Sequence, residues 1–168
     1  YGTAKRWLPE RFAEAAALVE GTVALFGSAD ERALCEEIAG MLRARGKSVY
    51  NFAGQTSLSE FIELAAACTV YLTNDSGGMH IASALGVPTV AVFGATDHIA
   101  TGHTGPLARI IRVPRECSPC LLRACPSALR LMTRVPPEQA ARAARELAQL
   151  TASHQHNNTS LRGQCACG

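Results

Sequence analysis

The sequence predicts an α/β fold in which a mostly parallel sheet carries helices on its faces. Short apolar runs rich in β-branched residues alternate along the chain with segments of helical periodicity. Strand–helix–strand repeats at this spacing imply right-handed crossovers, and therefore parallel strands. The runs are apolar at consecutive positions, as TVALFG and PTVAVFG show. Such runs are typical of strands buried on both faces of a parallel sheet.

Each predicted strand lies next to a predicted helix. The strands are expected at residues 22–27, 48–53, 69–73, 88–93 and 109–113. The helices are expected at residues 9–20, 31–45, 58–68, 79–85 and 137–150. The helix at 9–20 comes before any predicted strand. We therefore expect a first strand upstream of Tyr1, in a longer protein of which this chain is a piece.

Length and composition set the limits of this interpretation. The chain has 168 residues, of which 48% are hydrophobic and 18% are charged, so it can form one packed domain. That composition excludes an intrinsically disordered chain. No stretch reaches about 18 uninterrupted apolar residues, which a membrane-spanning helix needs. We expect a domain over residues 1–150 and a disordered polar tail over residues 151–168, where periodicity is lost.

Charge is unevenly distributed, although the net charge is only +2. Residues 1–108 have a balance of −4, whereas residues 109–146 carry eight arginines against three glutamates. Such a basic segment suits nucleic acid, an anionic membrane, an anionic substrate or simply a solvated helical surface. Nucleic acid is disfavoured, because aromatic residues do not alternate with the arginines as a stacking platform requires. The seven cysteines, an odd number, favour free thiols in a reducing cytoplasm.

Small and polar residues follow the predicted strands. In a parallel sheet the carboxyl ends of the strands share an edge, and ligands bind there beside helix N-termini. The segments at these ends are GSAD, AGQTS, TNDSGG and GATD. Helix capping explains part of this composition, because Ser57 with Glu60 matches a capping box and Asp75 or Ser76 is a good N-cap.

Gly77 and Gly78 need a further explanation, because a glycine within a helix costs about 1 kcal/mol relative to alanine. A ligand phosphate could approach this bare backbone and bind the free amides at the positive end of the helix dipole. Alternatively, the glycines allow the helix to pack closely on a strand. His80, one turn further on, could bind a phosphate, a ribose hydroxyl or a neighbouring carbonyl. Asp75 has no second carboxylate at a suitable spacing, which disfavours a magnesium site.

Lys5 lies in the basic segment Lys5-Arg6-Trp7, just before a helix that Pro9 can open. If a strand precedes this segment, Lys5 follows the carboxyl end of that strand and can reach a diphosphate at the same edge. The alternative interpretation is an ordinary surface charge near a chain end.

Three motifs in this order resemble the ADP-heptose:lipopolysaccharide heptosyltransferases, and most closely those of type II. They are AKRWLPERFAEAA, NFAGQTSLSEFIELAAAC and NDSGGMHIASALGVPTVAVFGATD. The resemblance extends from residue 1 to about residue 150. A single Asp-Ser-Gly-Gly would be a weak signal, but the ordered set is specific.

The resemblance implies a glycosyltransferase of the GT-B type, which has two Rossmann-like domains. The N-terminal domain of these enzymes holds the sugar acceptor, the inner core of lipopolysaccharide, and the C-terminal domain binds the donor ADP-heptose. This chain resembles the C-terminal domain without its first strand. The family implies a cytoplasmic enzyme, and peripheral contact with the inner membrane is a further expectation.

The same resemblance assigns roles to individual residues. It implies that Lys5 contacts the donor diphosphate and that Thr56 lies near the adenine. Asp30 or Glu31 is implied near the ribose hydroxyls. The residues implied around the phosphates and the heptose are Asp75, Ser76, Gly77, Gly78 and His80.

The implied reaction is an inverting transfer, in which an acceptor hydroxyl attacks the anomeric carbon of the heptose and ADP leaves. Lys5 and the helix start at residues 76–78 would stabilise the negative charge that grows on the diphosphate. The family needs no metal and no cofactor. Its general base is an acidic residue of the N-terminal domain, so this chain alone is expected to bind donor without turnover.

The segment after the fourth predicted strand departs from the family pattern. The family has a Thr-Gly-Pro-like segment there, and this sequence offers both Thr101-Gly102 and Thr104-Gly105-Pro106. The register of residues 95–106 therefore stays open.

Cys117, Cys120 and Cys125 form a cluster that provides three zinc ligands, whereas a structural zinc site uses four. Free thiols are the simpler interpretation. A zinc-organised interaction module that binds a partner through the arginine-rich region is one alternative function. A GT-B sugar-nucleotide epimerase is another, although the AGQTSL-type motif does not support it.

Overall fold

Parallel strands alternate with helices in the structure, a computed structural model that describes residues 7–94, 102, 105–112, 132 and 134–162. Side chains are described as far as residue 152. The strands are β1 (Val23–Leu25), β2 (Val49–Asn51), β3 (Tyr71–Asn74), β4 (Thr89–Val92) and β5 (Ala108–Ile111). Every strand pair within the described residues is parallel, which confirms the predicted α/β fold.

The helices lie close to the predicted ranges. They are α1 (Pro9–Ala17), α2 (Arg32–Arg43), α3 (Leu58–Ala66), α4 (Gly77–Ala84) and α7 (Pro137–Arg162), with a 3-10 turn η2 (Ala29–Glu31) before α2. Local sequence explains several of the starts, because Pro9 opens α1 and Ser57 caps α3. Of the described helices, none is both long and apolar enough to cross a bilayer.

Helix α7 corrects one boundary. The sequence predicts a helix that ends at residue 150 and a disordered tail after it, but the backbone is helical as far as Arg162. The prediction is therefore wrong for residues 151–162. No proline or glycine occurs between Pro137 and Gly163, so the chain contains no strong helix breaker before that point. Residues 163–168 lie outside the described residues.

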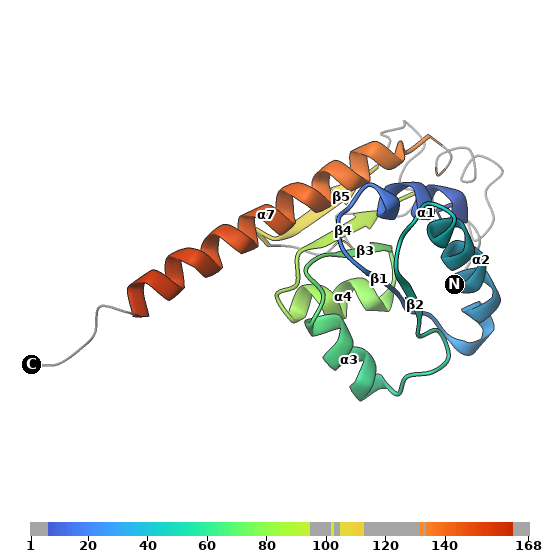
Figure 1. The fold of residues 1–168 in the computed structure, drawn as a ribbon, viewed down its shortest axis with the longest axis horizontal. Coiled ribbons are helices and arrows are strands. Elements are labelled where there is room, and N and C mark those ends of the chain that lie inside the picture. Colours follow the sequence, from blue (N-terminus) through green and yellow to red (C-terminus); the bar gives the residue numbers. More distant parts are fainter. Residues whose placement is uncertain (1–6, 95–101, 103–104, 113–131, 133, 163–168) are drawn as a thin grey trace, which may run out of the picture.

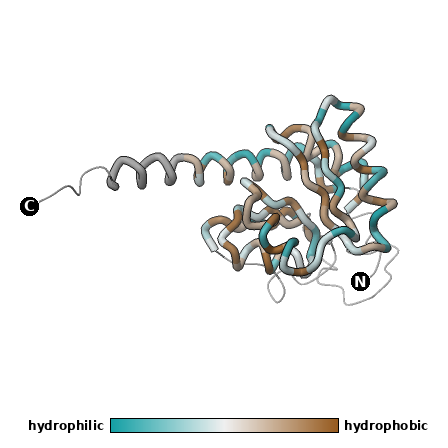
Figure 2. Tube along the Cα trace, turned by 60° about the horizontal axis from the view of Figure 1, so that its bottom comes forward, coloured by the Kyte–Doolittle hydropathy of each residue, from teal (hydrophilic) through white to brown (hydrophobic). Residues whose placement is uncertain are grey.

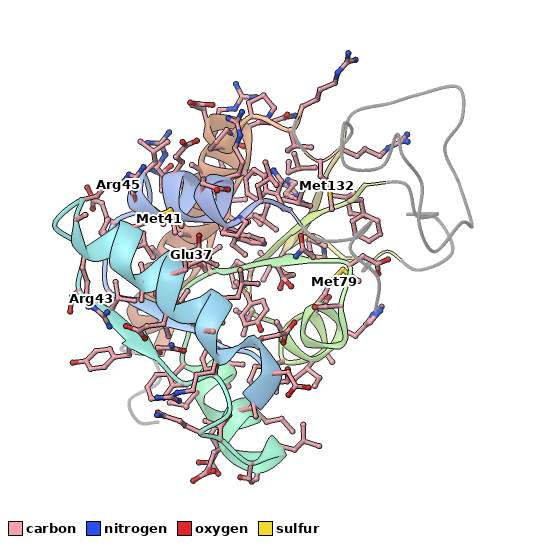
Figure 3. All side chains as sticks on the ribbon, turned by 90° about the vertical axis from the view of Figure 1, so that its right-hand side faces the viewer. Glu37, Met41, Arg43, Arg45, Met79 and Met132 are labelled. Carbon is pink, nitrogen blue, oxygen red and sulfur yellow. The ribbon has the colours of Figure 1, made fainter. Side chains whose placement is uncertain are left out.

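Helices cover the strands on two sides (Figure 1). Helices α1, α2 and α7 pack together on one side, whereas α3 and α4 lie on the other. The tube of Figure 2 shows the strands as mainly hydrophobic and the first half of α7 as a mixture of polar and apolar residues. In Figure 3, Glu37 and Arg43 mark the exposed side of α2, whereas the fully buried Met79 and Met132 lie beside the strands.

Strand β4 is the most deeply buried element. All of its residues are buried, and their side chains alternate between the two sides. Val90 and Val92 pack in the cluster that includes Leu147 of α7. Ala91 packs with Met79 of α4 on the other side. This strand therefore anchors the adjoining loops at the carboxyl edge.

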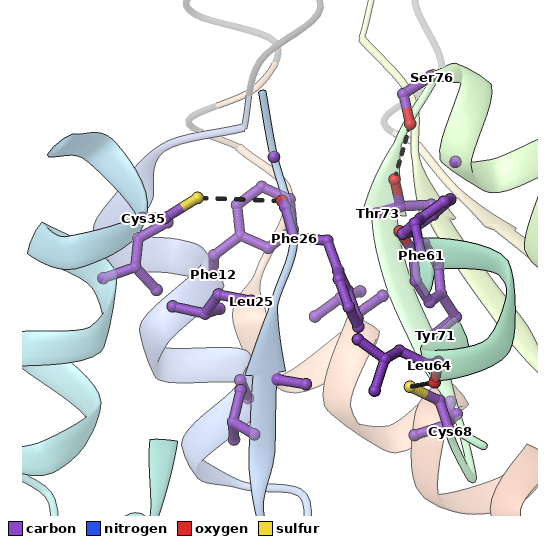
Figure 4. Close-up of a pocket in the computed structure, with 18 of the residues that line it drawn as sticks. Phe12, Leu25, Phe26, Cys35, Phe61, Leu64, Cys68, Tyr71, Thr73 and Ser76 are labelled. Atoms are coloured by element: carbon purple, nitrogen blue, oxygen red, sulfur yellow. Dashed lines mark hydrogen bonds between the residues drawn. The ribbon is translucent and has the colours of Figure 1, made fainter. Parts of the chain in front are cut away.

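The strands form two hydrogen-bonded sheets, whereas the sequence predicts a single one. One sheet has the order β1-β2 and the other has the order β3-β4-β5. Within the described residues, β1 and β3 face each other without a hydrogen bond between them (Figure 4). The interruption lies between these two strands and leaves a cavity, described below.

Candidate functional site

The loops that follow β1, β2 and β3 all lie at the carboxyl edge, because the strands within each sheet are parallel. They carry the polar segments that the sequence analysis singles out. The loop after β4 contains GATD, and its residues 95–101, 103 and 104 lie outside the described residues. The candidate site is therefore built from the first three loops.

Gly78 is explained by packing. A Cβ at this position would lie 2.9 Å from the hydroxyl of Tyr71 and 3.7 Å from the ring of Phe61. Burial raises the pKa of Tyr71 far above its usual range, so this hydroxyl stays protonated against the glycine. A Cβ at Gly77, in contrast, would meet no described atom within 4 Å. Close packing thus accounts for one glycine and leaves open space beside the other.

The N-terminus of α4 has amides available for an anion. Ser76 is the N-cap residue, but its side chain does not cap the helix. Its Oγ instead hydrogen-bonds with Oγ1 of Thr73 at 3.0 Å. No hydrogen bond between described residues uses the amides of Gly77 and Gly78. The Met79 amide, in contrast, donates to the Ser76 carbonyl at 3.1 Å. First-turn amides carry the partial positive charge of the helix dipole, which favours an anion.

The loops after β1 and β2 are in close contact. The Gly54 amide donates to the Gly27 carbonyl at 2.9 Å. Gly54 has φ +67°, and a Cβ there would lie 2.7 Å from Cα of Ala29. Glycine is required because both the left-handed backbone and the backbone contact exclude a side chain. This contact brings the loop that carries Thr56 next to the turn that carries Asp30 and Glu31.

Asp30 and Glu31 differ in their local roles. The Ser28 amide and the Ser28 hydroxyl both donate to Oε2 of Glu31, at 3.0 Å and 3.1 Å. Glu31 therefore stabilises the start of η2. Asp30 is exposed and makes no hydrogen bond or ion pair with a described residue. Of the two carboxylates, the one at Asp30 is more accessible to a ligand.

The capping box predicted for α3 is confirmed. The Glu60 amide donates to Ser57 Oγ at 3.3 Å, and the Ser57 amide donates to Oε2 of Glu60 at 2.7 Å. The Ser57 hydroxyl also donates to Oε2 of Glu60, at 2.8 Å. The two hydrogen bonds that Ser57 donates to this carboxylate, from its amide and from its hydroxyl, lower the pKa of the exposed Glu60 carboxyl below its ordinary value of 4.5. Thr56, immediately before the cap, is half-buried and faces the cavity.

Arg32 is part of the edge that sequence reasoning misses. Its Nη1 donates to the Ala53 carbonyl at 2.9 Å, which ties the start of α2 to the loop after β2. With the Gln55 carboxamide oriented toward the guanidinium, its oxygen accepts from both Arg32 Nη atoms at 2.7 Å. Arg32 and Gln55 are 23 residues apart, and no local pattern indicates this pairing. The only sequence signal is an arginine seven residues after β1 ends, at the start of the helix that follows.

Asn74 fixes the chain that enters α1. Its Oδ1 accepts a hydrogen bond from the Trp7 amide at 3.0 Å. Trp7 is 2% exposed, and its indole Nε1 has no hydrogen-bond partner among the described residues. The N-terminal approach to α1 therefore reaches the carboxyl end of β3. Lys5, two residues earlier in the sequence, lies outside the described residues.

Asp75 and His80 lie on either side of the α4 start. Asp75 is half-buried between β3 and the helix, and it has an interaction partner there. His80 is exposed in the first turn and a half of the helix. Neither lines the cavity described next, and the same is true of Asp30 and Gly77.

A cavity of about 870 Å³ opens between β1 and β3 (Figure 4). Most of its lining is strand backbone and apolar side chains, such as Phe12 and Leu64. Polar residues line both ends of the cavity. Glu20, Thr22 and Thr69 lie where β1 and β3 begin, and a larger polar group lies at the carboxyl edge. It consists of Glu31, Thr56, Ser57, Thr73, Asn74, Ser76 and Gly78. The structure thus brings four predicted site residues, Glu31, Thr56, Ser76 and Gly78, around one opening.

Cys117, Cys120 and Cys125 lie outside the described residues, as do residues 95–101, 103 and 104 of the segment 95–106, whose register stays open. Among the residues that the structure does describe, no group of three His, Cys, Asp or Glu side chains is arranged to hold a metal ion. The two cysteines with described thiols, Cys35 and Cys68, are free, and burial raises the pKa of each.

Comparisons with known proteins identify the family. The model of glycosyltransferase family 9 (heptosyltransferase) matches residues 1–129. Lipooligosaccharide heptosyltransferase 2 of Haemophilus influenzae is 41% identical over 117 residues, which are 67% of this chain and 34% of that protein. Lipooligosaccharide heptosyltransferase 2 of Campylobacter jejuni is 32% identical over 130 residues, 75% of this chain and 41% of that protein. The chain thus spans well under half the length of these relatives.

Solved structures agree with the fold. ADP-heptose lipopolysaccharide heptosyltransferase II of Escherichia coli has a TM-score of 0.75 at 30% identity, over 90% of this chain and 44% of that chain. Heptosyltransferase WaaC of Escherichia coli, solved with ADP, has a TM-score of 0.67 at 19% identity, which shows a shared fold alone. Both are heptosyltransferases of the predicted GT-B class. Neither alternative function from the sequence, the zinc module or the epimerase, is favoured by these matches.

Proposed function

Because the chain belongs to glycosyltransferase family 9, the heptosyltransferase family, we propose that it forms the donor-binding part of an enzyme that transfers heptose. The donor is ADP-heptose and the acceptor is the inner core of lipopolysaccharide. The observation that carries this proposal is the space at Gly77, where no described atom would meet a Cβ, beside first-turn amides that no described residue accepts from and next to the loops of β1 and β2. An anionic group of a nucleotide fits such a helix start.

The diphosphate of the donor binds at the start of α4. Gly77 and Gly78 offer their amides, and Ser76 offers a hydroxyl. Lys5 supplies the positive charge. Its role is supported by the hydrogen bond of Trp7, two residues later, to Asn74 at this same edge.

The nucleoside binds across the loops after β1 and β2, which Gly54 holds together. Thr56 is half-buried at the cavity rim and contacts the adenine. Asp30 accepts hydrogen bonds from the ribose hydroxyls in preference to Glu31, because Ser28 already occupies one Glu31 oxygen. The heptose then lies near Asp75 and the exposed His80.

The reaction is an inverting displacement that needs no metal. An acceptor hydroxyl attacks the anomeric carbon of the heptose, the bond from that carbon to the diphosphate oxygen breaks, and ADP leaves. Negative charge grows on the diphosphate during this step, and Lys5 with the α4 amides stabilises it. The general base belongs to the acceptor domain, so the chain alone binds donor without turnover. The whole enzyme acts in the cytoplasm, in peripheral contact with the inner membrane that carries its acceptor.

Calorimetric titration of ADP and ADP-heptose into the chain tests this proposal. We expect both ligands to bind. Lys5→Ala should weaken the binding of both, because it removes a positive charge from the diphosphate site, whereas Asp75→Ala should weaken the binding of ADP-heptose, because Asp75 is proposed to lie near the heptose. Glu37→Ala, on the exposed side of α2 away from the edge, is the matched control and should bind as the parent does. The donor site would be contradicted if the folded chain does not bind ADP at millimolar concentration, or if the variants bind with the same affinity as the parent.

A further inference from the structure

We propose that Arg32, the first residue of α2, is a positioning residue for recognition of the donor's base. It holds the 53–56 loop, which is the loop after β2 formed by residues 53–56, so that Thr56 meets the base. Arg32 does not line the cavity, and its guanidinium is used within the protein instead. The inference rests on the proposed function and extends it to a residue that acts through the 53–56 loop.

The guanidinium of Arg32 binds two separate points of the 53–56 loop. Its Nη1 donates to the Ala53 carbonyl at 2.9 Å. With the Gln55 carboxamide oriented toward the guanidinium, the Gln55 oxygen accepts from both Nη atoms at 2.7 Å. In that orientation the Gln55 nitrogen also donates to the Asn51 carbonyl, at 3.2 Å. One side chain of α2 therefore braces the loop at Ala53 and at Gln55.

Ala53 shows why the loop needs a donor from α2. It is fully buried, so both of its peptide groups need partners inside the protein. The Ala53 amide donates to Oδ1 of Asn51 at 3.1 Å, and its carbonyl accepts from Arg32. Asn51 is itself held by α2, because its Nδ2 donates to Oε2 of Glu36 at 2.8 Å. Helix α2 thus determines the position of Ala53 directly at the carbonyl and through Asn51 at the amide.

The charge of Arg32 is not used in an ion pair with a described residue. Glu36, one turn further along α2, is the carboxylate best placed by spacing for such a pair. Its oxygens instead accept from Arg43 at 2.6 Å and from Asn51. The acceptors that remain for Arg32 are neutral carbonyl oxygens of the 53–56 loop. A planar guanidinium can serve two such acceptors at once, whereas the ammonium of a lysine is a point donor.

Thr56 depends on its neighbours for its position, because it makes no hydrogen bond with a described residue. On its C-terminal side, the Ser57 cap fixes the start of α3. On its N-terminal side lies Gln55, and among the described residues only Arg32 connects Gln55 to another helix. Loss of Arg32 therefore loosens the side of Thr56 that the cap does not hold. The close contact of Gly54 with Ala29 keeps the loop attached, so we expect displacement of Thr56 without unfolding.

Calorimetric titration of the chain with ADP and with UDP tests the inference. UDP has the same ribose and diphosphate but a smaller base, so its affinity depends less on Thr56. Arg32→Ala removes both contacts with the loop, Arg32→Lys keeps the charge as a point donor, and Gln55→Ala removes one contact without a change of charge. Arg45→Ala is the matched control, because Arg45 lies beyond the other end of α2 and bonds to the Met41 carbonyl (Figure 3).

We expect Arg32→Ala to weaken the binding of ADP by about tenfold, the effect of one net hydrogen bond, and that of UDP by less. The preference for ADP over UDP should therefore fall. Gln55→Ala should show the same selective loss, and Arg32→Lys should lie between Arg32→Ala and the parent. Arg45→Ala should bind both nucleotides as the parent does. Thermal melts followed by circular dichroism check that each variant is folded, and Gln55→Ala, at an exposed position, decides the outcome if Arg32→Ala does not fold.

The inference is overturned if Arg32→Ala binds ADP as Arg45→Ala does. It is also overturned if ADP and UDP lose affinity by the same factor, because Arg32 would then act on the phosphates or on the whole fold. A parent chain that binds both nucleotides equally would leave no recognition of the base to position, with the same consequence. If the parent binds neither nucleotide, the proposed donor site itself fails, a result that differs from failure of the inference alone, in which the parent prefers ADP and the Arg32 variants match it.

Discussion

The amide of Trp7 donates to Oδ1 of Asn74 at 3.0 Å, across 67 residues of sequence. This bond ties the chain that enters α1 to the last residue of β3. Because Trp7 is buried, its amide has little access to water as an alternative partner. The bond therefore holds Trp7 and the start of α1 at the carboxyl end of β3.

Asn74→Ala should lower the free energy of unfolding by about 1–3 kcal/mol, because it leaves the Trp7 amide without an acceptor. Asn74→Asp keeps an acceptor oxygen at this position and should lower the free energy of unfolding by less. Urea denaturation followed by tryptophan fluorescence measures both variants. Equal stability of Asn74→Ala and the parent would show that this hydrogen bond contributes nothing.

Gly78→Ala should destabilise the fold by about 1–3 kcal/mol, the usual cost of overpacking. The added methyl group would lie 2.9 Å from the Tyr71 hydroxyl. Tyr71→Phe removes that hydroxyl, so the double variant should recover much of the loss. A double-mutant cycle from thermal melts measures the coupling, and strict additivity of the two changes would refute the contact.

Gly77→Ala should separate binding from folding. No described atom lies near its added Cβ, and alanine is the better helix former, so stability should rise by up to about 1 kcal/mol. The methyl group would occupy the space proposed for the donor diphosphate, so ADP affinity should fall. If Gly77→Ala keeps the full ADP affinity, the phosphates of ADP bind elsewhere on the chain.

Gly54→Ala should be more damaging than Gly21→Ala. Both glycines have positive φ, which costs an L-residue about 1 kcal/mol or more. Gly54 also meets Cα of Ala29 at 2.7 Å, whereas Gly21 has open space around it. Comparison of the two melting temperatures isolates the loop contact from the backbone conformation. If the two variants lower the melting temperature equally, the close approach of Gly54 to Ala29 adds nothing to the cost of the substitution.

The Ser57–Glu60 capping box should make stability fall with acid. The pKa of Glu60 is lower in the folded chain, so its contribution is present above the unfolded value of 4.5 and disappears as pH falls through the folded pKa. Glu60→Gln should therefore reduce the melting temperature at neutral pH and flatten its decline below pH 4.5. Glu63→Gln, an exposed change on the same helix, is the control and should leave the acid decline as it is in the parent.

Local patterns were sufficient to predict the elements of the fold. The apolar runs located all of the described strands, and the sequence Ser57-Leu58-Ser59-Glu60 located the start of α3 with its capping box. The end of α7 is not predictable in the same way, because loss of amphipathic periodicity after residue 150 does not mean loss of helix. A helix that leaves its partners needs no apolar face, only the absence of a breaker.

Relationships between distant residues could not be predicted. Sequence reasoning left the two explanations of Gly77 and Gly78 open, because only the position of Tyr71 shows that one glycine is required for packing. Arg32 was missed because its partners, Ala53 and Gln55, belong to another loop. The site residues themselves stay predictions until a ligand is bound.

The most direct test of the donor site is an NMR titration of the isotope-labelled chain with ADP. The account predicts that the amide resonances of Gly77 and Gly78 shift together with those of Thr56 and Asp30 and saturate at one common dissociation constant. Gly21 and Gly46, in turns away from this edge, should stay unchanged. Saturable shifts confined to other loops, with Gly77 unmoved in a folded chain, would contradict a phosphate site at the start of α4.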